Sequence, residues 1–358
     1  MSTPHLYADA VHRTFSLLAM VLLILCTASP GTASAEPMPH RAVVVVSGGD
    51  AVSPFTTPDL ACENGLAAGN TDTEIRDYLL RQGYLVYTSP AMAGRGPVTD
   101  QTGFGAFSGC PVTLPDVMTV DSTGSIDLAG EHLARFLNYL HTERGVDEVD
   151  VVGHSMGGLY SRAAFRVLQQ TGSPVHIRSM TTIGTPWQGS FLSDYANGIT
   201  PLSDCLGDAF CEKGMQGMKA RAELLMTGSG REVNQRYLMG ATGWNEFQAG
   251  VLDAIPVVVI GGNRFTKPGA VNPAVWPNDG IVATSSAVAT DISDRVLPHR
   301  RCVSFDDTHS IFVSDAAGLP WDTGLTWDPR TLAVLHDAIE GAPGALAEPT
   351  RQGCPPPS

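Results

Sequence analysis

The stretch Val149-Asp150-Val151-Val152-Gly153-His154-Ser155-Met156-Gly157-Gly158 decides the fold. Its first four residues predict a buried strand, and the apolar spacing after it predicts a helix. The glycines that flank Ser155 have no side chains, so the strand can turn sharply into the helix and expose the serine hydroxyl. The amide of Met156 then lies at the helix start, where unpaired N–H groups favour a developing oxyanion. We interpret Ser155 as a nucleophile; the alternative is an idle serine in a glycine-rich turn.

Strand and helix signals alternate along the chain on both sides of this turn. The strands are predicted at 42–46, 84–88, 149–152, 177–183, 256–260 and 302–305, and the main helices near 74–82, 133–144, 159–168 and 332–339. Thr71 and Glu74 have the spacing of a capping box at the first helix start. The alternation predicts a mostly parallel sheet flanked by helices. With the strand–serine–helix turn, it indicates the α/β-hydrolase fold.

Three stretches depart from the alternation. Residues 89–125 are rich in Gly, Pro, Ser and Thr and are predicted to form a long loop, with Cys110 as an anchor. Residues of about 190–253 are predicted to form a cap or lid over the site, where flexible apolar side chains accept acyl chains. A packed structural insertion is the open alternative. The tail at about 341–358 is rich in Ala and Pro and is expected to be loose, apart from Cys354.

The N-terminal residues 1–35 have the pattern of a signal peptide. A modest basic region at His12 and Arg13 precedes the apolar run Leu17 to Cys26, which is too short to span a bilayer. Ala33-Ser34-Ala35 provides a small-x-small cleavage site. A lipoprotein would use Cys26, but Leu25 is large where a small residue is preferred. We therefore expect a secreted protein whose residues 36–358 form one catalytic domain.

Cysteine content and charge fit this interpretation. Six of the seven cysteines follow residue 35, and an even number in an exported protein suggests three disulfides. Cys205 can pair with Cys211 across a short loop; Cys62 with Cys110 and Cys302 with Cys354 are the remaining guesses among 15 possible connectivities. A zinc site is disfavoured because there is no C-x-x-C. The net charge of −14 argues against nucleic acid or an anionic membrane as a partner.

A serine nucleophile needs a base, and four histidines follow Ser155. In α/β hydrolases the chain order is serine, acid, histidine, with acid and base in loops after later strands. His309 follows the predicted strand 302–305 in Asp306-Asp307-Thr308-His309-Ser310 and is the predicted base. His176 comes too early, His299 precedes the strand, and His336 lies in the last helix.

The acid that orients the base is predicted to be Asp279. It lies in Trp276-Pro277-Asn278-Asp279-Gly280-Ile281-Val282, after the strand 256–260, where Asn and Gly suit a tight turn that presents a carboxylate inward. A plain turn role is the alternative reading. The other candidates are Asp253, Asp291, Asp294, Asp306 and Asp307. A second oxyanion donor is expected after the first strand, in Ser47-Gly48-Gly49-Asp50, and we choose the N–H of Gly49.

Four segments together resemble the secreted bacterial lipases of the α/β-hydrolase superfamily. They are the turn at 151–158, Ile183-Gly184-Thr185-Pro186-Trp187-Gln188-Gly189-Ser190, Asn278-Asp279-Gly280-Ile281-Val282 and Thr308-His309-Ser310. The resemblance covers roughly residues 42–313. It implies a serine-triad carboxylester hydrolase (Ser155, Asp279, His309) that acts on acylglycerols or similar lipids without a cofactor, with lipid–water interface contact through the cap and no obligate protein partner.

The chain departs from this family at two positions. Trp187 stands where relatives have histidine in Gly-Thr-Pro-His, and Ser47 where many have histidine in His-Gly, so the oxyanion loop and the substrate mouth are expected to differ. Some relatives bind structural calcium near the histidine loop, but we interpret Asp306 and Asp307 as solvated surface residues and expect no metal. A phospholipase, a polyester depolymerase, a thioesterase or an acyltransferase would use the same triad. The rival from another class is a binding protein on an inactive hydrolase scaffold.

Overall fold

The computed structural model describes residues 41–62, 71–98, 112–225, 228–342 and 350–356. All of them lie in one compact unit that spans Pro39–Ser358. The predicted signal peptide, residues 1–35, lies outside the described residues.

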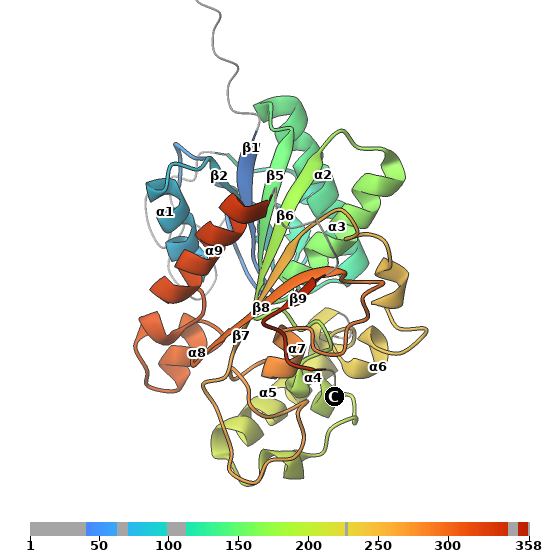
Figure 1. Ribbon diagram of the computed structural model, residues 1–358, viewed down its shortest axis with the longest axis vertical. Coiled ribbons are helices and arrows are strands. Elements are labelled where there is room, and N and C mark those ends of the chain that lie inside the picture. Colours follow the sequence, from blue (N-terminus) through green and yellow to red (C-terminus); the bar gives the residue numbers. More distant parts are fainter. Residues whose placement is uncertain (1–40, 63–70, 99–111, 226–227, 343–349, 357–358) are drawn as a thin grey trace, which may run out of the picture. The chain divides into compact units, whose positions relative to one another are not determined.

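A seven-stranded parallel sheet forms the centre of this unit, with the strand order β2-β1-β5-β6-β7-β8-β9 (Figure 1). The strands are β1 Arg41–Val46, β2 Val86–Thr88, β5 Glu148–His154, β6 His176–Ile183, β7 Val257–Gly262, β8 His299–Phe305 and β9 Thr350–Gln352. Because β2 and β5 lie on opposite sides of β1, the chain reverses its winding direction there. The carboxyl ends of β1 and β5 meet at this switch point, where α/β proteins bind ligands.

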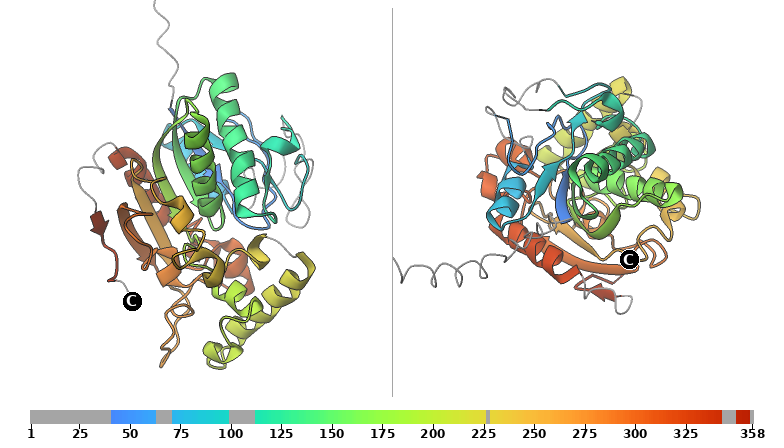
Figure 2. Two further views of the ribbon diagram at one scale, coloured as in Figure 1. Left: turned by 90° about the vertical axis from the view of Figure 1, so that its right-hand side faces the viewer. Right: turned by 90° about the horizontal axis from the view of Figure 1, so that it is seen from above.

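Helices cover both faces of the sheet (Figure 2). The helices are α1 Thr73–Arg81 and α9 Pro329–Gly341 on one face, and α2 Ile126–Arg144 and α3 Gly157–Thr171 on the other. In β1, Val44 and Val46 pack towards α2 and α3, whereas Val43 and Val45 pack towards α1 and α9. A strand that is buried on both faces needs a continuous apolar run. The predicted parallel sheet flanked by helices is confirmed.

The ends of α2 and α1 show which sequence signals for helix ends agree with the structure. Ser125 caps α2 by accepting from the amide of Leu128, and Gly145 ends this helix at φ 67°. The predicted capping box of Thr71 and Glu74 is wrong, because α1 starts after Asp72 and has no side-chain cap. Asp72 is fully buried and accepts a hydrogen bond from Ser47 instead. A tertiary contact therefore replaces the local one.

The residues between β6 and β7 form a helical insertion. Its helices are α4 Phe191–Ala196, η2 Leu202–Cys205, α5 Ala209–Leu225, η3 Gly228–Gly230, α6 Gln235–Leu238 and η4 Glu246–Gln248. A small apolar core joins Phe191, Leu192, Met215 and the Cys205–Cys211 disulfide of the insertion to Val275 and Trp276 of the loop after β7. Three short helices follow β7 and β8: α7 Thr284–Ala287, α8 Ile311–Ala316 and η5 Trp321–Thr323.

The predicted long loop at 89–125 contains more structure than expected. Its described parts hold η1 Asp116–Met118 and a small parallel sheet of β3 Ala91–Met92 and β4 Val120–Asp121. The predicted anchor Cys110 lies outside the described residues, so its pairing with Cys62 stays a prediction.

The C-terminal tail corrects another expectation. We predicted a loose tail, but Thr350–Gln352 forms the edge strand β9, which pairs in parallel with β8. The Cys302–Cys354 disulfide fastens it to the sheet, as that pairing predicted. Within the described ranges, no helix is long and apolar enough to cross a bilayer.

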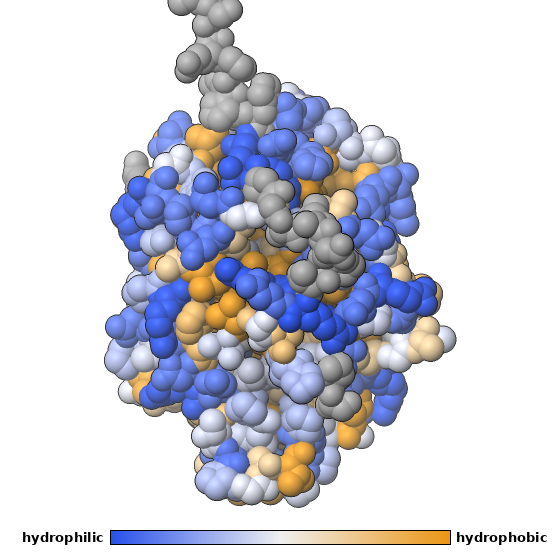
Figure 3. Space-filling model, in the orientation of Figure 1, coloured by the Kyte–Doolittle hydropathy of each residue, from blue (hydrophilic) through white to orange (hydrophobic). Residues whose placement is uncertain are grey.

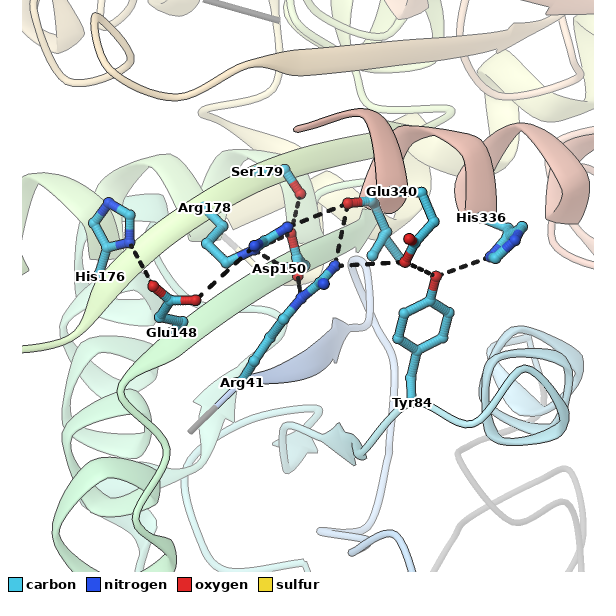
Figure 4. Close-up of polar contacts among 10 residues, drawn as sticks. Arg41, Tyr84, Glu148, Asp150, His176, Arg178, Ser179, His336 and Glu340 are labelled. Carbon is cyan, nitrogen blue, oxygen red and sulfur yellow. Dashed lines mark hydrogen bonds and ion pairs between the residues drawn. The ribbon is translucent and has the colours of Figure 1, made fainter. Parts of the chain in front are cut away.

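Opposite the switch point, a polar cluster joins the amino ends of three strands (Figure 4). Asp150 of β5 is buried and accepts hydrogen bonds from Arg41 of β1 at 2.8 Å and from Ser179 of β6 at 2.5 Å. Arg178 pairs with the same carboxylate at 3.3 Å. Both arginines also donate to the main-chain oxygen of Ile339 at the end of α9. The cluster ties α9 to the sheet far from Ser155.

Candidate active site

Ser155 lies on a strained turn between β5 and α3. Its φ of 52° is in the left-handed region, which residues other than glycine rarely adopt. A Cβ at Gly157 would lie 2.2 Å from the carbonyl oxygen of Val46, and one at Gly153 would lie 2.6 Å from the amide nitrogen of Gly158. The turn therefore requires glycine at both flanking positions. The predicted strand–serine–helix turn is the one that the structure contains.

His309 and Asp279 form a buried hydrogen-bonded pair. The Nδ1 atom of His309 lies 2.7 Å from Oδ2 of Asp279, and both residues are almost fully buried. The other carboxylate oxygen of Asp279 accepts from the amides of Ile281 at 2.9 Å and Val282 at 2.7 Å. Since Asp279 accepts at Nδ1, the neutral imidazole carries its proton there and leaves Nε2 free to accept another.

Loops at the carboxyl ends of two neighbouring strands hold this pair. Asp279 lies in the loop after β7, and His309 follows β8. The amide of His309 donates to the main-chain oxygen of Asp279 at 2.8 Å, which connects the two loops directly. Gly184, after β6, packs against both side chains, because a Cβ there would lie 2.9 Å from the His309 ring. The sheet thus positions the acid and the base predicted from the sequence.

The loop after β1 approaches Ser155 closely enough to help bind an oxyanion. A Cβ at Gly48 would lie 2.5 Å from Cβ of Ser155, and one at Gly49 would lie 2.7 Å from Sδ of Met156. Within the described part of the chain, the amides of Gly49 and Met156 have no backbone partner. These two N–H groups, predicted as oxyanion donors, therefore remain available for a ligand.

A cavity of about 580 Å³ opens over these residues. Ser155, His309, Gly49 and Met156 line it together. Apolar side chains form much of the remaining wall: Pro186, Met218, Val233, Ile281, Val282, Phe312 and Val313. Met218 and Val233 come from the insertion between β6 and β7, so the predicted cap region contributes to the cavity.

An ion pair connects the insertion to the loop after β1 across this cavity. Arg221 of α5 donates to Asp50, the residue after Gly49, and both side chains are partly exposed. Asp50 has a φ of 60°, a backbone conformation that residues other than glycine rarely adopt.

The rejected histidines lie elsewhere. His176 is at the exposed start of β6, His336 lies in α9 beside Tyr84, and His299 starts β8. Among the rejected acids, Asp294 pairs with Arg300 and Arg351 at the far side of the sheet.

Asp306 and Asp307 were expected to be solvated, and this is wrong for Asp307, whose side chain is buried. Arg330 of α9 donates to both carboxylates and to Asp328. Burial and the neighbouring Asp328 raise the pKa of Asp307 to about 8. The described residues contain no cluster of three or more His, Cys, Asp or Glu arranged to hold a metal. The guanidinium of Arg330 is the positive group that these three carboxylates share.

The two departures from the lipase motifs both turn inward, away from the cavity. Trp187 is fully buried, and its ring centroid lies 4.4 Å from Cζ of Arg162; the Trp244 ring centroid lies 4.9 Å from the same atom. Burial lowers the pKa of Arg162 to about 9. Ser47 donates to Asp72. Neither residue lines the cavity, so the expected change at the substrate mouth does not come from these side chains.

Sequence reasoning missed two buried residues beside the site. His154, next to Ser155 in the motif, lies with Nε2 3.2 Å from the main-chain oxygen of His309. Its Nδ1 lies 3.8 Å from Asp72. The position of His154 in the motif was the available signal; nothing in the sequence identified Asp72.

Comparison with known proteins points to the same segment. Residues 129–208, which contain Ser155 and the Gly184-Thr185-Pro186 stretch, match the model of the PGAP1-like alpha/beta domain. The chain is 36% identical over 70 residues to a triacylglycerol lipase from Pseudarthrobacter phenanthrenivorans, over 20% of each chain. It is also 36% identical over 70 residues to one from Burkholderia plantarii, over 20% of this chain and 18% of that one. The resemblance to lipases of the α/β-hydrolase superfamily is confirmed.

These matches are partial in extent. The chain spans about a fifth of the length of the curated relatives it matches. Among solved structures, the mature form of the Bacillus licheniformis lipase BlEst2 aligns with 84% of this chain and 94% of its own, at 14% identity and a TM-score of 0.43.

Proposed function

We propose that this protein is a secreted serine hydrolase that cleaves carboxylic esters of lipids, with acylglycerols or related acyl esters as substrates. The observation that carries the proposal is one cavity bordered by a serine on a strained turn and by a histidine bonded to a buried aspartate. Serine needs such a base because its hydroxyl is a weak nucleophile. Ser155, His309 and Asp279 supply the three roles.

In the proposed reaction, Oγ of Ser155 attacks the ester carbonyl while Nε2 of His309 takes its proton. The amides of Met156 and Gly49 donate to the carbonyl oxygen as it becomes negative. The histidine then protonates the leaving alcohol, and an acyl group remains on Ser155. A water molecule, deprotonated by the same histidine, releases the acid. Asp279 stabilises the imidazolium in both halves of the reaction.

The cavity wall supports an acyl substrate. Its side chains are mainly apolar, and two of them, Met218 and Met156, are flexible thioethers that adapt to chains of different shape. We also propose that the insertion contacts a lipid–water interface. Leu206 and Leu224 are exposed on the insertion, and Val271 is exposed in the loop after β7. Figure 3 shows a small apolar patch at the lower end of the molecule.

Secretion is part of the proposal. The disulfides Cys205–Cys211 and Cys302–Cys354 fit an oxidising compartment, and the N-terminal 35 residues have the pattern of a signal peptide.

Hydrolysis of p-nitrophenyl esters from short to long acyl chains tests the proposal. We expect Ser155→Ala to lose activity by several orders of magnitude and to lose stoichiometric labelling by an organophosphonate. Ser173→Ala, just beyond the far end of α3, is the matched control and should keep both. An unlabelled wild-type protein, or a Ser155→Ala variant with more than a few per cent of the activity, contradicts the assignment. Added alcohol acceptor distinguishes hydrolysis from acyl transfer.

A further inference from the structure

The two proposed oxyanion donors come from segments that lie far apart in the chain. The amide of Met156 is at the start of α3, and the amide of Gly49 is in the loop after β1. Two N–H groups stabilise an oxyanion together only when both lie at hydrogen-bond distance from the same oxygen. The spacing between these two segments must therefore be fixed, and the proposed ester hydrolysis assigns no residue to that task.

Ser122, which follows β4, binds the loop after β1 at two peptide groups. Its main-chain oxygen accepts from the amide of Asp50 at 3.1 Å. Its hydroxyl donates to the main-chain oxygen of Ala51 at 2.8 Å, nearer than the main-chain oxygen of Met92 at 3.1 Å. A Cβ at Gly49 would lie 3.9 Å from the same Ser122 oxygen. Ser122 is fully buried, so the loop is fastened inside the protein directly beside its oxyanion donor.

Tyr160 connects this serine to the helix that carries the other donor. It lies on α3 one turn after Met156, and its amide donates to the main-chain oxygen of Met156 at 3.0 Å. Its hydroxyl donates to the main-chain oxygen of Ser122 at 3.0 Å. That oxygen accepts from Tyr160 and from the amide of Asp50, so both of its lone pairs are used. A single carbonyl group thus joins α3 to the loop after β1.

The buried position of Tyr160 makes this contact strong. Burial raises the pKa of the Tyr160 hydroxyl well above its usual value, so the group remains a proton donor at neutral pH. A hydrogen bond in a protein interior is electrostatically stronger than one in water. The ion pair of Asp50 with Arg221 is partly exposed, and such pairs contribute little. The buried contacts therefore hold Asp50 at its strained φ of 60°.

We propose that Ser122 and Tyr160 are positioning residues that set the distance between the two oxyanion donors. The hydrogen bonds of Tyr160 and Asp50 to one oxygen fix the loop of Gly49 relative to the helix of Met156. In the part of the chain that the structure describes, the cavity wall contains neither Ser122 nor Tyr160, so both act without touching the substrate. This inference rests on the proposed function, because it needs the two amides to bind a developing oxyanion.

Two small substitutions test this role. Tyr160→Phe removes one hydroxyl group and keeps the buried ring, and Ser122→Ala removes the bond to Ala51 but keeps the main-chain oxygen. Loss of a whole oxyanion donor lowers kcat by about 10²- to 10³-fold, so a donor that is only displaced should cost less. We expect each variant to lower kcat for a p-nitrophenyl ester by about 5- to 50-fold, with KM changed by less than about threefold.

A thionoester substrate separates the oxyanion donors from the base. It carries sulfur in place of the carbonyl oxygen, and sulfur is the weaker hydrogen-bond acceptor, so its hydrolysis depends less on these donors. The ratio of kcat/KM for the oxoester to that for the thionoester should fall by about fivefold or more in Tyr160→Phe and Ser122→Ala. Gly184→Ala, which displaces His309 instead, should keep the wild-type ratio. An unchanged ratio in Tyr160→Phe would overturn the proposal, whatever its melting temperature.

Tyr84→Phe and Ser179→Ala are the matched controls. Both hydroxyls are hydrogen-bonded far from Ser155, Tyr84 to Glu340 at 2.6 Å and Ser179 to Asp150 at 2.5 Å (Figure 4). These variants can lower the melting temperature but should leave kcat and the oxoester-to-thionoester ratio unchanged. If either control lowers the ratio as much as Tyr160→Phe does, the loss of a hydroxyl acts through overall stability and the proposal is wrong.

Amide hydrogen exchange tests the contact without catalysis. The amide of Asp50 is bonded to Ser122 and should exchange slowly in wild type. In Tyr160→Phe its exchange should accelerate by about tenfold more than that of the β5 amides, which report global unfolding. Equal acceleration of both would overturn the positioning proposal even in an active enzyme. Failure of the proposed function would instead appear as a wild-type protein whose ester hydrolysis Ser155→Ala does not change.

Discussion

Replacing Asp279 by asparagine tests the proposed acid most sharply, because the structure separates its two roles. Oδ1 accepts from the amides of Ile281 and Val282, and an asparagine oxygen can do the same. Oδ2 accepts from Nδ1 of His309 at 2.7 Å, where asparagine would place an NH₂ group. Two donors cannot pair, so the His309 ring must move its proton to Nε2. The base then has no lone pair towards Ser155.

The expected loss follows from this tautomer change. A base held in the wrong tautomer lowers kcat by about 10⁴-fold, or about 5 kcal/mol of transition-state stabilisation. The fold should be little affected because the two amide hydrogen bonds remain. Steady-state hydrolysis of a p-nitrophenyl ester measures kcat, and thermal unfolding checks the fold. Asp294→Asn, on the far side of the sheet, is the control. A folded Asp279→Asn variant with more than a few per cent of wild-type kcat, or a crippled Asp294→Asn variant, would refute the reasoning.

Three further predictions concern strain, charge and covalent links. Gly184→Ala should lower kcat at least tenfold, because the new Cβ would lie 2.9 Å from the imidazole of His309. Gly145 has a similar positive φ but open space around it, so Gly145→Ala should cost only about 1–2 kcal/mol of stability. Equal kcat values for the two variants would contradict this prediction. Burial raises the pKa of Asp194 to about 6, so the ionisation of this buried carboxyl group at higher pH destabilises the fold. In urea unfolding, the stability of Asp194→Asn minus that of wild type should be about 2–3 kcal/mol larger at pH 8 than at pH 4. A stability difference that does not change with pH would count against the prediction. Cys354→Ser opens a loop closed across a sequence separation of 52 and should lower stability by up to about 4 kcal/mol, while thiol titration of the denatured, unreduced wild-type mature protein should find no free thiol.

The parts of the fold that the sequence predicted are those with strong local signals. Val43 to Val46 had to be buried on both faces, and Gly153 and Gly157 are required by contacts within 3 Å. Asp279 and His309, the predicted acid and base, could be separated from their competitors because chain order and strand ends restrict their positions, and the structure brings the two side chains together. Periodicity and turn chemistry sufficed for these elements.

Other features escaped prediction because distant residues determine them. The strand β9 consists of Thr-Arg-Gln, which has no apolar pattern, and it is held by β8 and a disulfide. The burial of Arg162 depends on Trp187 and Trp244, which lie 25 and 82 positions further along the chain. The orientation of Asp72 depends on Ser47. No local sequence pattern predicts these contacts. At the start of α1, the spacing of Thr71 and Glu74 even predicted a capping box that the structure does not contain.

The small core that the insertion shares with the loop after β7 has a consequence for how the molecule unfolds and evolves. Phe191 and Met215 of the insertion pack with Trp276 of that loop in a cluster distinct from the two that sandwich the sheet. Elements with independent cores behave as separate cooperative units, which open with their own free energies. Substitutions in the two kinds of core should then add without coupling. Natural variation can therefore reshape the cavity wall that the insertion contributes while the sheet that holds Ser155 keeps its stability.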